Sequence, residues 1–285
     1  MSQPSDKVSP KVPAAPPGVV KKVRTAHLLQ MKQAGRPITM VTAYDAPTAA
    51  LADEAGIDVI LVGDSVGMVV HGMETTLPVT VDMMVLHSQA VARGSHRSLI
   101  VTDLPFMSYQ VSVEQALQTA GRIMKEGGCA AVKLETGTES VVPTVKAIVE
   151  AGIPVMGHLG LVPQSINALG GYRVQGRDPQ DAENLLKLAQ EIEAAGAFAI
   201  VLELIPGPLA DRVTKALRIP VIGIGAGAGC DGQVIVQHDV LGITQHPPRF
   251  ARKYMDGRAG VLRAFRKYAR DVRERTFPGP AETIE

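Results

Sequence analysis

The sequence predicts an α/β protein folded as a closed (β/α)8 TIM barrel, because apolar strand-like runs and helical patterns alternate along almost the whole chain. The runs are continuous rather than alternating in polarity, which is typical of parallel strands buried on both faces. An open, doubly wound sheet is the alternative for the same alternation. Eight runs are found: Ile38–Ala43, Val59–Val62, Leu99–Thr102, Ala131–Leu134, Val155–Gly157, Ala199–Leu202, Val221–Ile224 and a last one within Val234–Ile243.

Local signals indicate where the predicted helices begin and end. Thr25–Gln33 is expected to form a short helix before the first strand and to cap the bottom of the barrel. Ser112 and Gln115 have capping-box spacing, and Asp178 with Pro179 gives another helix a cap and a first-turn proline. Glycines that suit the left-handed end of a helix precede the next strand at Gly56, Gly128, Gly152 and Gly196.

Length and composition predict one folded domain that follows a flexible N-terminal tail. The 285 residues fit a single barrel. Residues 1–23 contain five prolines among Ser and Lys, a composition that buries too little to offset the entropy of ordering, and they are predicted to form a flexible tail. Residues 24–285 are predicted to form one catalytic barrel domain that includes a C-terminal helix.

Composition argues against several kinds of partner. The 29 basic and 28 acidic residues leave a formal charge of +1, and aromatic residues are only 4%, so we expect no nucleic-acid partner. No apolar run reaches the roughly 18 to 20 residues of a membrane helix, so no membrane partner is expected. Cys129 and Cys230 have neither zinc-site nor disulfide-framework spacing, which favours a reducing, cytoplasmic setting.

Acidic residues stand where three neighbouring strands are predicted to end. Asp64, Asp103 and Glu135 follow or close their strands, and the ends of parallel barrel strands converge on one face. Each carboxylate alone is as readily explained by capping a helix or by pairing with a basic neighbour. Three together in a core are costly unless they bind a cation, and oxygen ligands favour Mg²⁺ over zinc.

Three further polar residues belong to the same predicted face. Lys133 is expected to anchor a substrate carboxylate, to form a Schiff base, or simply to pair with Glu135 or Asp103, and the sequence does not separate these roles. Glu203 lies in an apolar segment, which favours a general base over a carboxylate tied to an Arg or to backbone donors. His158 is assigned a supporting role.

These residues belong to ordered motifs that resemble the ketopantoate hydroxymethyltransferase family, within the phosphoenolpyruvate/pyruvate barrel superfamily. The resemblance extends from about Thr25 to Gly279. Its motifs are Thr42-Ala43-Tyr44-Asp45, Val62-Gly63-Asp64-Ser65, Thr76-Leu77-Pro78-Val79-Thr80, Asp103-Leu104-Pro105-Phe106-Met107, Val132-Lys133-Leu134-Glu135, Gly157-His158-Leu159-Gly160-Leu161, Gly170-Gly171-Tyr172, Val174-Gln175-Gly176-Arg177 and Gly223-Ile224-Gly225-Ala226-Gly227.

The resemblance implies an enzyme of pantothenate biosynthesis. Such an enzyme transfers a hydroxymethyl group from its co-substrate 5,10-methylenetetrahydrofolate to 3-methyl-2-oxobutanoate, giving 2-dehydropantoate. The family pattern implies Mg²⁺ at Asp64, Asp103 and Glu135, the last at least partly through water. It implies that Asp64, Ser65, Asp103 and Lys133 hold the oxo acid, that Glu203 is the proton-abstracting base, and that the chain assembles as a homodecamer, a pentamer of dimers.

Two rival functions remain at this point. A magnesium-dependent carbon–carbon lyase or phosphonomutase of the same superfamily would share the metal and the handling of an oxo acid. Those enzymes usually carry a catalytic cysteine on a mobile loop, and Cys129 and Cys230 do not fall where that loop is expected. A non-catalytic binding barrel is disfavoured because so many charged residues at strand ends are costly to bury.

Overall fold

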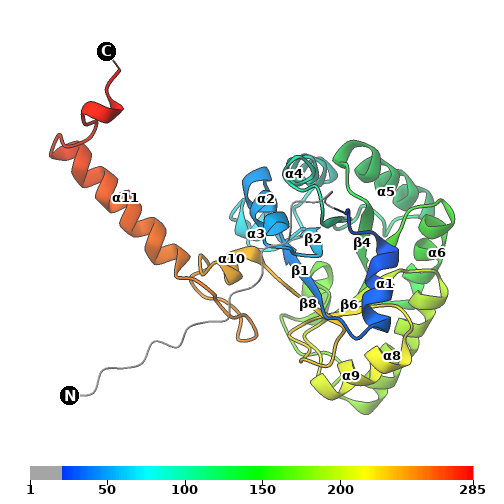
Figure 1. Ribbon diagram of the computed structural model, residues 1–285. Helices are drawn as coiled ribbons and strands as arrows, with labels where there is room; N and C mark the ends of the chain where they lie inside the picture. Colours follow the sequence, from blue (N-terminus) through cyan, green and yellow to red (C-terminus); the bar gives the residue numbers. More distant parts are fainter. Residues whose placement is uncertain (1–20, 285) are drawn as a thin grey trace, which may run out of the picture.

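The computed structural model describes residues 21–284 and confirms the closed barrel (Figure 1). All neighbouring strands are parallel and pair in chain order, and the last strand pairs with the first. An open sheet is thereby excluded. The strands are β1 (Ile38–Thr42), β2 (Val59–Val62), β3 (Leu99–Asp103), β4 (Ala131–Glu135), β5 (Val155–Gly160), β6 (Ala199–Glu203), β7 (Val221–Ile224) and β8 (Gly232–Ile235).

Helices connect the strands and cover the outside of the barrel (Figure 1). Short helices of one turn lie mainly in the loops that follow the strands. The helices are α1 (Thr25–Gln33), α2 (Ala46–Glu54), α3 (Val66–Val69), α4 (Val81–Gly94), α5 (Val113–Gly127), η1 (Glu139–Val141), α6 (Val142–Glu150), η2 (Pro163–Ser165), α7 (Ile166–Leu169), α8 (Pro179–Ala194), α9 (Gly207–Ala216), α10 (Gln237–Val240), α11 (Gly257–Arg273) and η3 (Pro280–Glu282).

Two apolar cores hold these layers together, one inside the barrel and one between the barrel and its helices. Side chains of a strand alternate between them, because successive residues point to opposite faces. In β3, for example, Leu99 and Val101 belong to the inner core and Ile100 to the outer core. Leu28 and Met31 of α1 join the inner core, so α1 caps the bottom of the barrel, as predicted.

Polar contacts also fix α1 at the bottom of the barrel. The Lys32 ammonium lies 2.9 Å from the Asp231 carboxylate and donates to the carbonyl oxygens of Thr214 and Ile219 at 2.9 Å each. Most of the predicted tail, residues 1–20, lies outside the described residues. Val23, at the end of that predicted segment, is buried, and its amide donates to the Arg97 carbonyl.

The predicted helix signals have the expected geometry. The Ser112 hydroxyl accepts from the Gln115 amide at 3.1 Å, and Asp178 accepts from the Gln180 amide at 2.8 Å. The predicted helix-ending glycines all have left-handed backbones, which only glycine adopts without strain. Their φ angles are 84° at Gly56, 74° at Gly128, 86° at Gly152 and 97° at Gly196.

The last strand is the main correction to the predicted elements. It begins at Gly232, before the predicted segment Val234–Ile243, and most of that segment turns into α10 and a loop. A steric constraint explains why a glycine, and not an apolar residue, begins this strand. A Cβ at position 232 would collide with the backbone oxygen of Ile38, so only glycine lets β8 approach β1 closely enough to close the barrel.

The C-terminal helix α11 projects away from the barrel (Figure 1). Of its 17 residues only Gly257 is buried. Phe265 and Tyr268 are the most exposed of its large apolar side chains. Within residues 21–284, no helix has both the length and the apolar character needed to cross a bilayer.

Candidate active site

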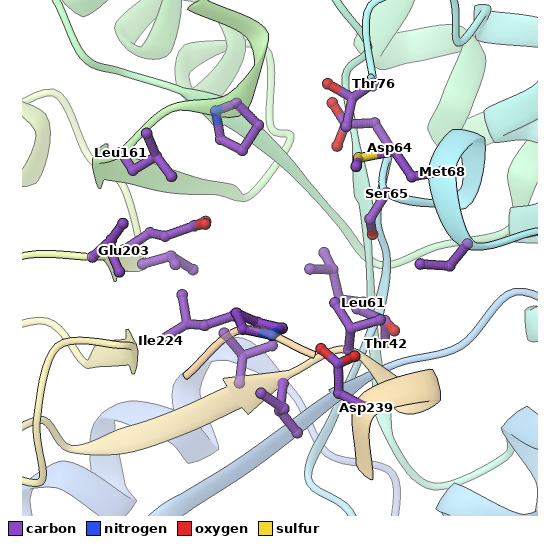
Figure 2. Close-up of a pocket in the computed structure, with 18 of the residues that line it drawn as sticks. Thr42, Leu61, Asp64, Ser65, Met68, Thr76, Leu161, Glu203, Ile224 and Asp239 are labelled. Carbon is purple, nitrogen blue, oxygen red and sulfur yellow. The ribbon is translucent and has the colours of Figure 1, made fainter. Parts of the chain in front are cut away.

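A cavity of about 660 Å³ opens at the carboxyl ends of the barrel strands (Figure 2). Every residue that the sequence nominated for the site contributes to its wall. These residues are Asp64, Ser65, Asp103, Lys133, Glu135, His158 and Glu203.

Strand alternation explains why most of these side chains meet. Leu99, Val101 and Asp103 share one side of β3, and the first two lie in the inner core, so Asp103 also points inward. The same alternation directs Lys133 and Glu135 inward after the inner-core residue Ala131. On β5 it directs His158 inward, two residues after the inner-core residue Met156. On β6 it directs Glu203 inward, two residues after the inner-core residue Val201.

Lys133 forms an ion pair with Asp103 across adjacent strands. The two residues are register partners in β3 and β4, and Lys133 Nζ lies 2.8 Å from Asp103 Oδ1. Burial favours the neutral amine, but Asp103 and Asp64 outweigh it and raise the pKa of Lys133 above its usual value. Lys133 is therefore a fixed cation, which suits a carboxylate anchor and argues against a Schiff-base nucleophile.

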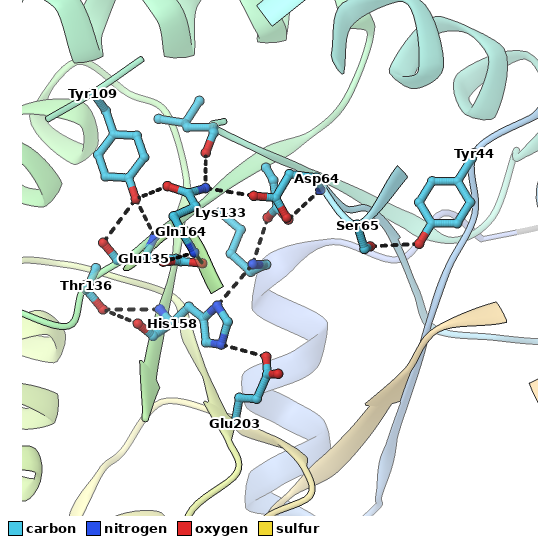
Figure 3. Close-up of polar contacts among 12 residues, drawn as sticks. Tyr44, Asp64, Ser65, Tyr109, Lys133, Glu135, Thr136, His158, Gln164 and Glu203 are labelled. Carbon is cyan, nitrogen blue, oxygen red and sulfur yellow. Dashed lines mark hydrogen bonds and ion pairs between the residues drawn. The ribbon is translucent and has the colours of Figure 1, made fainter. Parts of the chain in front are cut away.

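A buried glutamine links two of the three acids, and the third joins them through a backbone amide (Figure 3). Gln164, in η2 directly after β5, donates from Nε2 to Asp64 Oδ2 at 2.9 Å. Its backbone amide donates to both carboxylate oxygens of Glu135 at 3.0 and 3.1 Å. The Asp64 amide in turn donates to Asp103 Oδ2 at 3.1 Å. The acids thus form one network rather than three separate helix caps.

The charges of this network are unbalanced. Three buried carboxylates share the one ammonium of Lys133. Burial, together with the charge of Asp103, raises the pKa of Asp64 to about 7. Burial and the Asp64 charge raise the pKa of Glu135 well above its usual value. A second cation in the cavity would offset this excess of negative charge.

The donor atoms fit a hard divalent cation, although they are not arranged around one. Among residues 21–284, no three His, Cys, Asp or Glu side chains are close enough together to hold a metal ion as they stand. Lys133 and Gln164 occupy the space between the acids. Asp103 Oδ1 is nevertheless buried without an aligned hydrogen-bond donor, since its contact with Lys133 is an ion pair only. An all-oxygen donor set with a spare buried oxygen fits Mg²⁺ chemistry.

Glu203 faces the cavity beside a neutral histidine. His158 Nε2 lies 3.1 Å from Glu203 Oε2, outside the alignment of a straight hydrogen bond, and His158 Nδ1 lies 3.4 Å from the Lys133 ammonium. Burial, helped by the Lys133 charge, lowers the pKa of His158. With the ammonium donating to Nδ1, the histidine proton is on Nε2 and faces Glu203. His158 thereby supports the Glu203 carboxylate without neutralising it.

Two residues next to Glu203 have left-handed backbones: Leu204, which follows it in the chain, and Gly160, which lies beside it on β5. Leu204 has a φ of 49°, a left-handed conformation that costs a residue with a Cβ about 1 kcal/mol. Its amide is held by the Ile224 carbonyl at 2.9 Å. Gly160, the register partner of Glu203, has a φ of 91°, and a Cβ there would collide with the Glu203 carbonyl. The end of β6 is thus bent in a way that depends on glycine at position 160.

Three participants were not predicted from the sequence: Gln164, Tyr109 and Tyr44. The Tyr109 hydroxyl donates to Gln164 Oε1 at 2.8 Å and accepts from the Glu135 amide at 3.1 Å. Tyr44 shares a hydrogen bond of 2.8 Å with the Ser65 hydroxyl. Gln164 follows a strand end, but neither its residue type nor its spacing marked it as a site residue. Uncharged side chains gave no charge pattern to find.

Comparison with known families gives a match over nearly the whole chain. The family model described as ketopantoate hydroxymethyltransferase matches residues 22–280. A 3-methyl-2-oxobutanoate hydroxymethyltransferase of Carboxydothermus hydrogenoformans is 54% identical over 258 residues, which are 90% of this chain and 93% of that protein. A mitochondrial enzyme of that name from Arabidopsis thaliana is 50% identical over 269 residues, covering 92% of this chain and 78% of that protein.

Solved structures with the same barrel are more distant. A phosphonopyruvate hydrolase in complex with oxalate and Mg²⁺ has a TM-score of 0.61 at 14% identity and covers 92% of both chains. A phosphoenolpyruvate phosphomutase from Streptomyces platensis subsp. rosaceus has a TM-score of 0.60 at 16% identity and covers 88% of both chains. At such identities the likeness extends to the fold alone.

Proposed function

This chain belongs to the ketopantoate hydroxymethyltransferase family and is an enzyme; on that premise we propose that it transfers a hydroxymethyl group from 5,10-methylenetetrahydrofolate to 3-methyl-2-oxobutanoate, giving 2-dehydropantoate for pantothenate biosynthesis. The observation that carries the proposal is the shared cavity. A candidate base, Glu203, and a fixed cation, Lys133, face the same space as the unbalanced acids Asp64, Asp103 and Glu135.

The acids Asp64, Asp103 and Glu135 would hold Mg²⁺. Mg²⁺ keeps several waters, so one or two direct carboxylates suffice, and Glu135, already engaged by the Gln164 amide, would act through water. When bound, the ion polarises the 2-oxo group of the substrate, an effect on the order of several kcal/mol. Gln164 keeps Asp64 oriented toward the cavity.

The oxo acid is held by Ser65, Asp103 and Lys133, with Asp64. Lys133 supplies a positive charge for the substrate carboxylate, because its own pKa is raised and it remains protonated. The Ser65 hydroxyl, bonded to Tyr44, supplies a directed hydrogen bond. The Lys133 ammonium and the Ser65 hydroxyl hold the substrate at two points, so its C3 keeps one orientation. The reaction then takes place between oriented partners rather than through a bimolecular encounter.

Glu203 removes the proton from C3 of the bound oxo acid. Its carboxylate side chain is 16% exposed and faces the cavity, and His158 limits its orientation from one side. Water opens the methylene bridge of the folate, breaking both of its C–N bonds, so that tetrahydrofolate leaves and the one-carbon unit is released as formaldehyde. The C3 carbanion adds to the formaldehyde carbonyl, and the alkoxide that forms takes back the proton from Glu203, giving 2-dehydropantoate.

A lyase or phosphonomutase activity is the second candidate. The solved structures with this barrel include such enzymes, and they support it only through the fold. Relatives at 50 to 54% identity over about nine-tenths of the chain carry the transferase name, which favours the transferase.

The direct test is product analysis after mixing the protein with Mg²⁺, 3-methyl-2-oxobutanoate and 5,10-methylenetetrahydrofolate. We expect 2-dehydropantoate to form only when the folate is present. Consumption of the oxo acid without folate would support the lyase instead. Glu203→Gln should abolish C3 deuterium exchange and keep Mg²⁺-dependent binding of the oxo acid, whereas the surface control Glu183→Gln should exchange normally. Exchange at the original rate in Glu203→Gln would assign the base elsewhere.

We also propose a homo-oligomer, specifically a decamer built as a pentamer of dimers. The support in this chain is α11, whose apolar side chains Phe265 and Tyr268 lie exposed away from the barrel. Sedimentation equilibrium tests the mass. We place the enzyme in the cytoplasm, because Cys129 and Cys230 are both free thiols. Fractionation of the source cells tests that assignment.

A further inference from the structure

The cavity extends well beyond the residues that handle the oxo acid. Its volume of about 660 Å³ lies in the range of roughly 300 to 1,000 Å³ that is typical of pockets for drug-sized ligands. The acids, Lys133 and Glu203 line the side formed by β2 to β6. The opposite side is formed by the end of β1, by β8 and by the chain that follows β8. Its polar and aromatic residues are Thr42, Asp239, Thr244, His246, Arg249 and Phe250.

Asp239 is the distinctive residue of this second side. It lies in α10, just after β8, and only 6% of it is exposed. In the described part of the chain, no hydrogen-bond donor or basic side chain contacts its carboxylate, in contrast to the buried Asp103 and Asp64. Figure 2 shows its side chain directed into the cavity. Because its oxygens face the cavity and no donor among the described residues occupies them, this carboxylate is available to accept hydrogen bonds from a ligand.

The geometry points to a ligand with two adjacent N–H donors. A carboxylate has two oxygens side by side, and a planar edge with two parallel N–H groups matches them. The oxo acid is assigned to Lys133 on the other side of the cavity, which leaves Asp239 for a second ligand. The 2-amino-4-oxopyrimidine edge of a pterin has the required pair of donors, at N3 and at the 2-amino group.

We propose that Asp239 binds the pterin ring of the folate donor by accepting hydrogen bonds from N3–H and from the 2-amino group. This assignment rests on the proposed function, since it names the residue that recognises the co-substrate. Asp239 and Glu203 project into the same space from different sides (Figure 2). A ring anchored at the end of β8 therefore faces the oxo acid held over β2 to β6.

The mouth of the cavity on this side suits the acidic tail of a folate. His246 and Arg249 line it and are exposed, and within residues 21–284 neither forms an ion pair. Phe250 also lines this side and offers an apolar surface for the aromatic part of the ligand. This wall thus has an acceptor, Asp239, in its buried part and a cation, Arg249, at the exposed rim, which matches the N–H edge of a pterin and the carboxylates of a folate tail.

The experiment measures binding of tetrahydrofolate to the full-length protein by calorimetry without oxygen. Asp239→Asn keeps the shape but turns one acceptor into a donor, so affinity for tetrahydrofolate should fall by about tenfold to hundredfold. The affinity for 3-methyl-2-oxobutanoate with Mg²⁺ should stay within about twofold, because that ligand binds on the other side. Asp45→Asn is the matched control: Asp45 has the same charge at the same barrel end, but its carboxylate caps the Thr48 amide at 2.7 Å.

A second measurement changes the ligand instead of the protein. The analogue 2-desamino-2-methyl-tetrahydrofolate lacks one of the two donors and should bind the wild-type protein about tenfold more weakly than tetrahydrofolate. Asp239→Asn should discriminate much less between the two ligands. Equal affinity of Asp239→Asn and wild type for tetrahydrofolate, or equal affinity of the wild type for both ligands, would overturn the assignment of Asp239 and leave the proposed reaction standing. A wild-type protein that binds no tetrahydrofolate would overturn both.

Discussion

Replacing Gln164 by leucine tests whether this one side chain organises the acids of the site. The substitution keeps the backbone amide that binds Glu135 but removes the side-chain bonds to Asp64 Oδ2 and to the Leu104 carbonyl, both 2.9 Å long. The bond to an ionised carboxylate contributes about 2 kcal/mol and the bond to a carbonyl about 1 kcal/mol. Tyr109 loses its acceptor on Gln164 but keeps the Glu135 carbonyl at 3.4 Å.

The expected loss is therefore about 3 kcal/mol in the free energy of unfolding, a large part of the stability of a typical domain. Urea denaturation near pH 8 measures it, because Asp64, with a pKa of about 7, is then mostly ionised. The matched control is Gln110→Leu, which removes only the partly buried bond of 3.1 Å from Gln110 to Gln164 Oε1, the oxygen that also accepts from Tyr109, and should cost about 1 kcal/mol or less. If the two variants lose equal stability, Gln164 does not organise the acids as described.

Three further outcomes are expected. Lys133→Met leaves the three buried acids without their ammonium, so the free energy of unfolding should fall by about 3 kcal/mol without metal, and saturating Mg²⁺ should restore much of it; the absence of any Mg²⁺ effect in urea titrations would contradict the metal site. Mg²⁺ at about 100 times its Kd should stabilise the wild type by about 2.7 kcal/mol, and Asp64→Asn should lose most of this gain when thermal unfolding is compared with and without a chelator. Asp53, whose pKa is lowered to about 2 by the Ser98 amide and Ser95 hydroxyl despite the opposing effect of burial, should contribute about 1 kcal/mol after solvent screening. Because its folded pKa lies below the ordinary 3.8, the difference between wild type and Asp53→Asn should be complete above pH 4 and decline as the pH falls toward 2; a difference that grows on acidification would refute the assignment.

The sequence by itself determined the barrel and most of the charged residues that line its cavity. Continuous apolar runs predicted strands buried on both faces, and capping residues and glycines predicted the helix ends. Both predictions were possible because these signals act within one turn or one strand. Asp103, Glu135 and Glu203 close their strands, and strand ends converge in a barrel. Their location at one site followed from chain order alone.

Only the tertiary structure decided which uncharged and distant residues complete the site. Gln164 meets Asp64 across 100 positions of sequence, and Asp239 lines the cavity from α10, within a segment whose apolar pattern predicted a strand. Neither contact leaves a local pattern, since each depends on the closure and register of the whole barrel. The projection of α11 away from the barrel is also decided only in the tertiary structure: its amphipathic sequence predicts a helix, but not that its apolar face lies exposed.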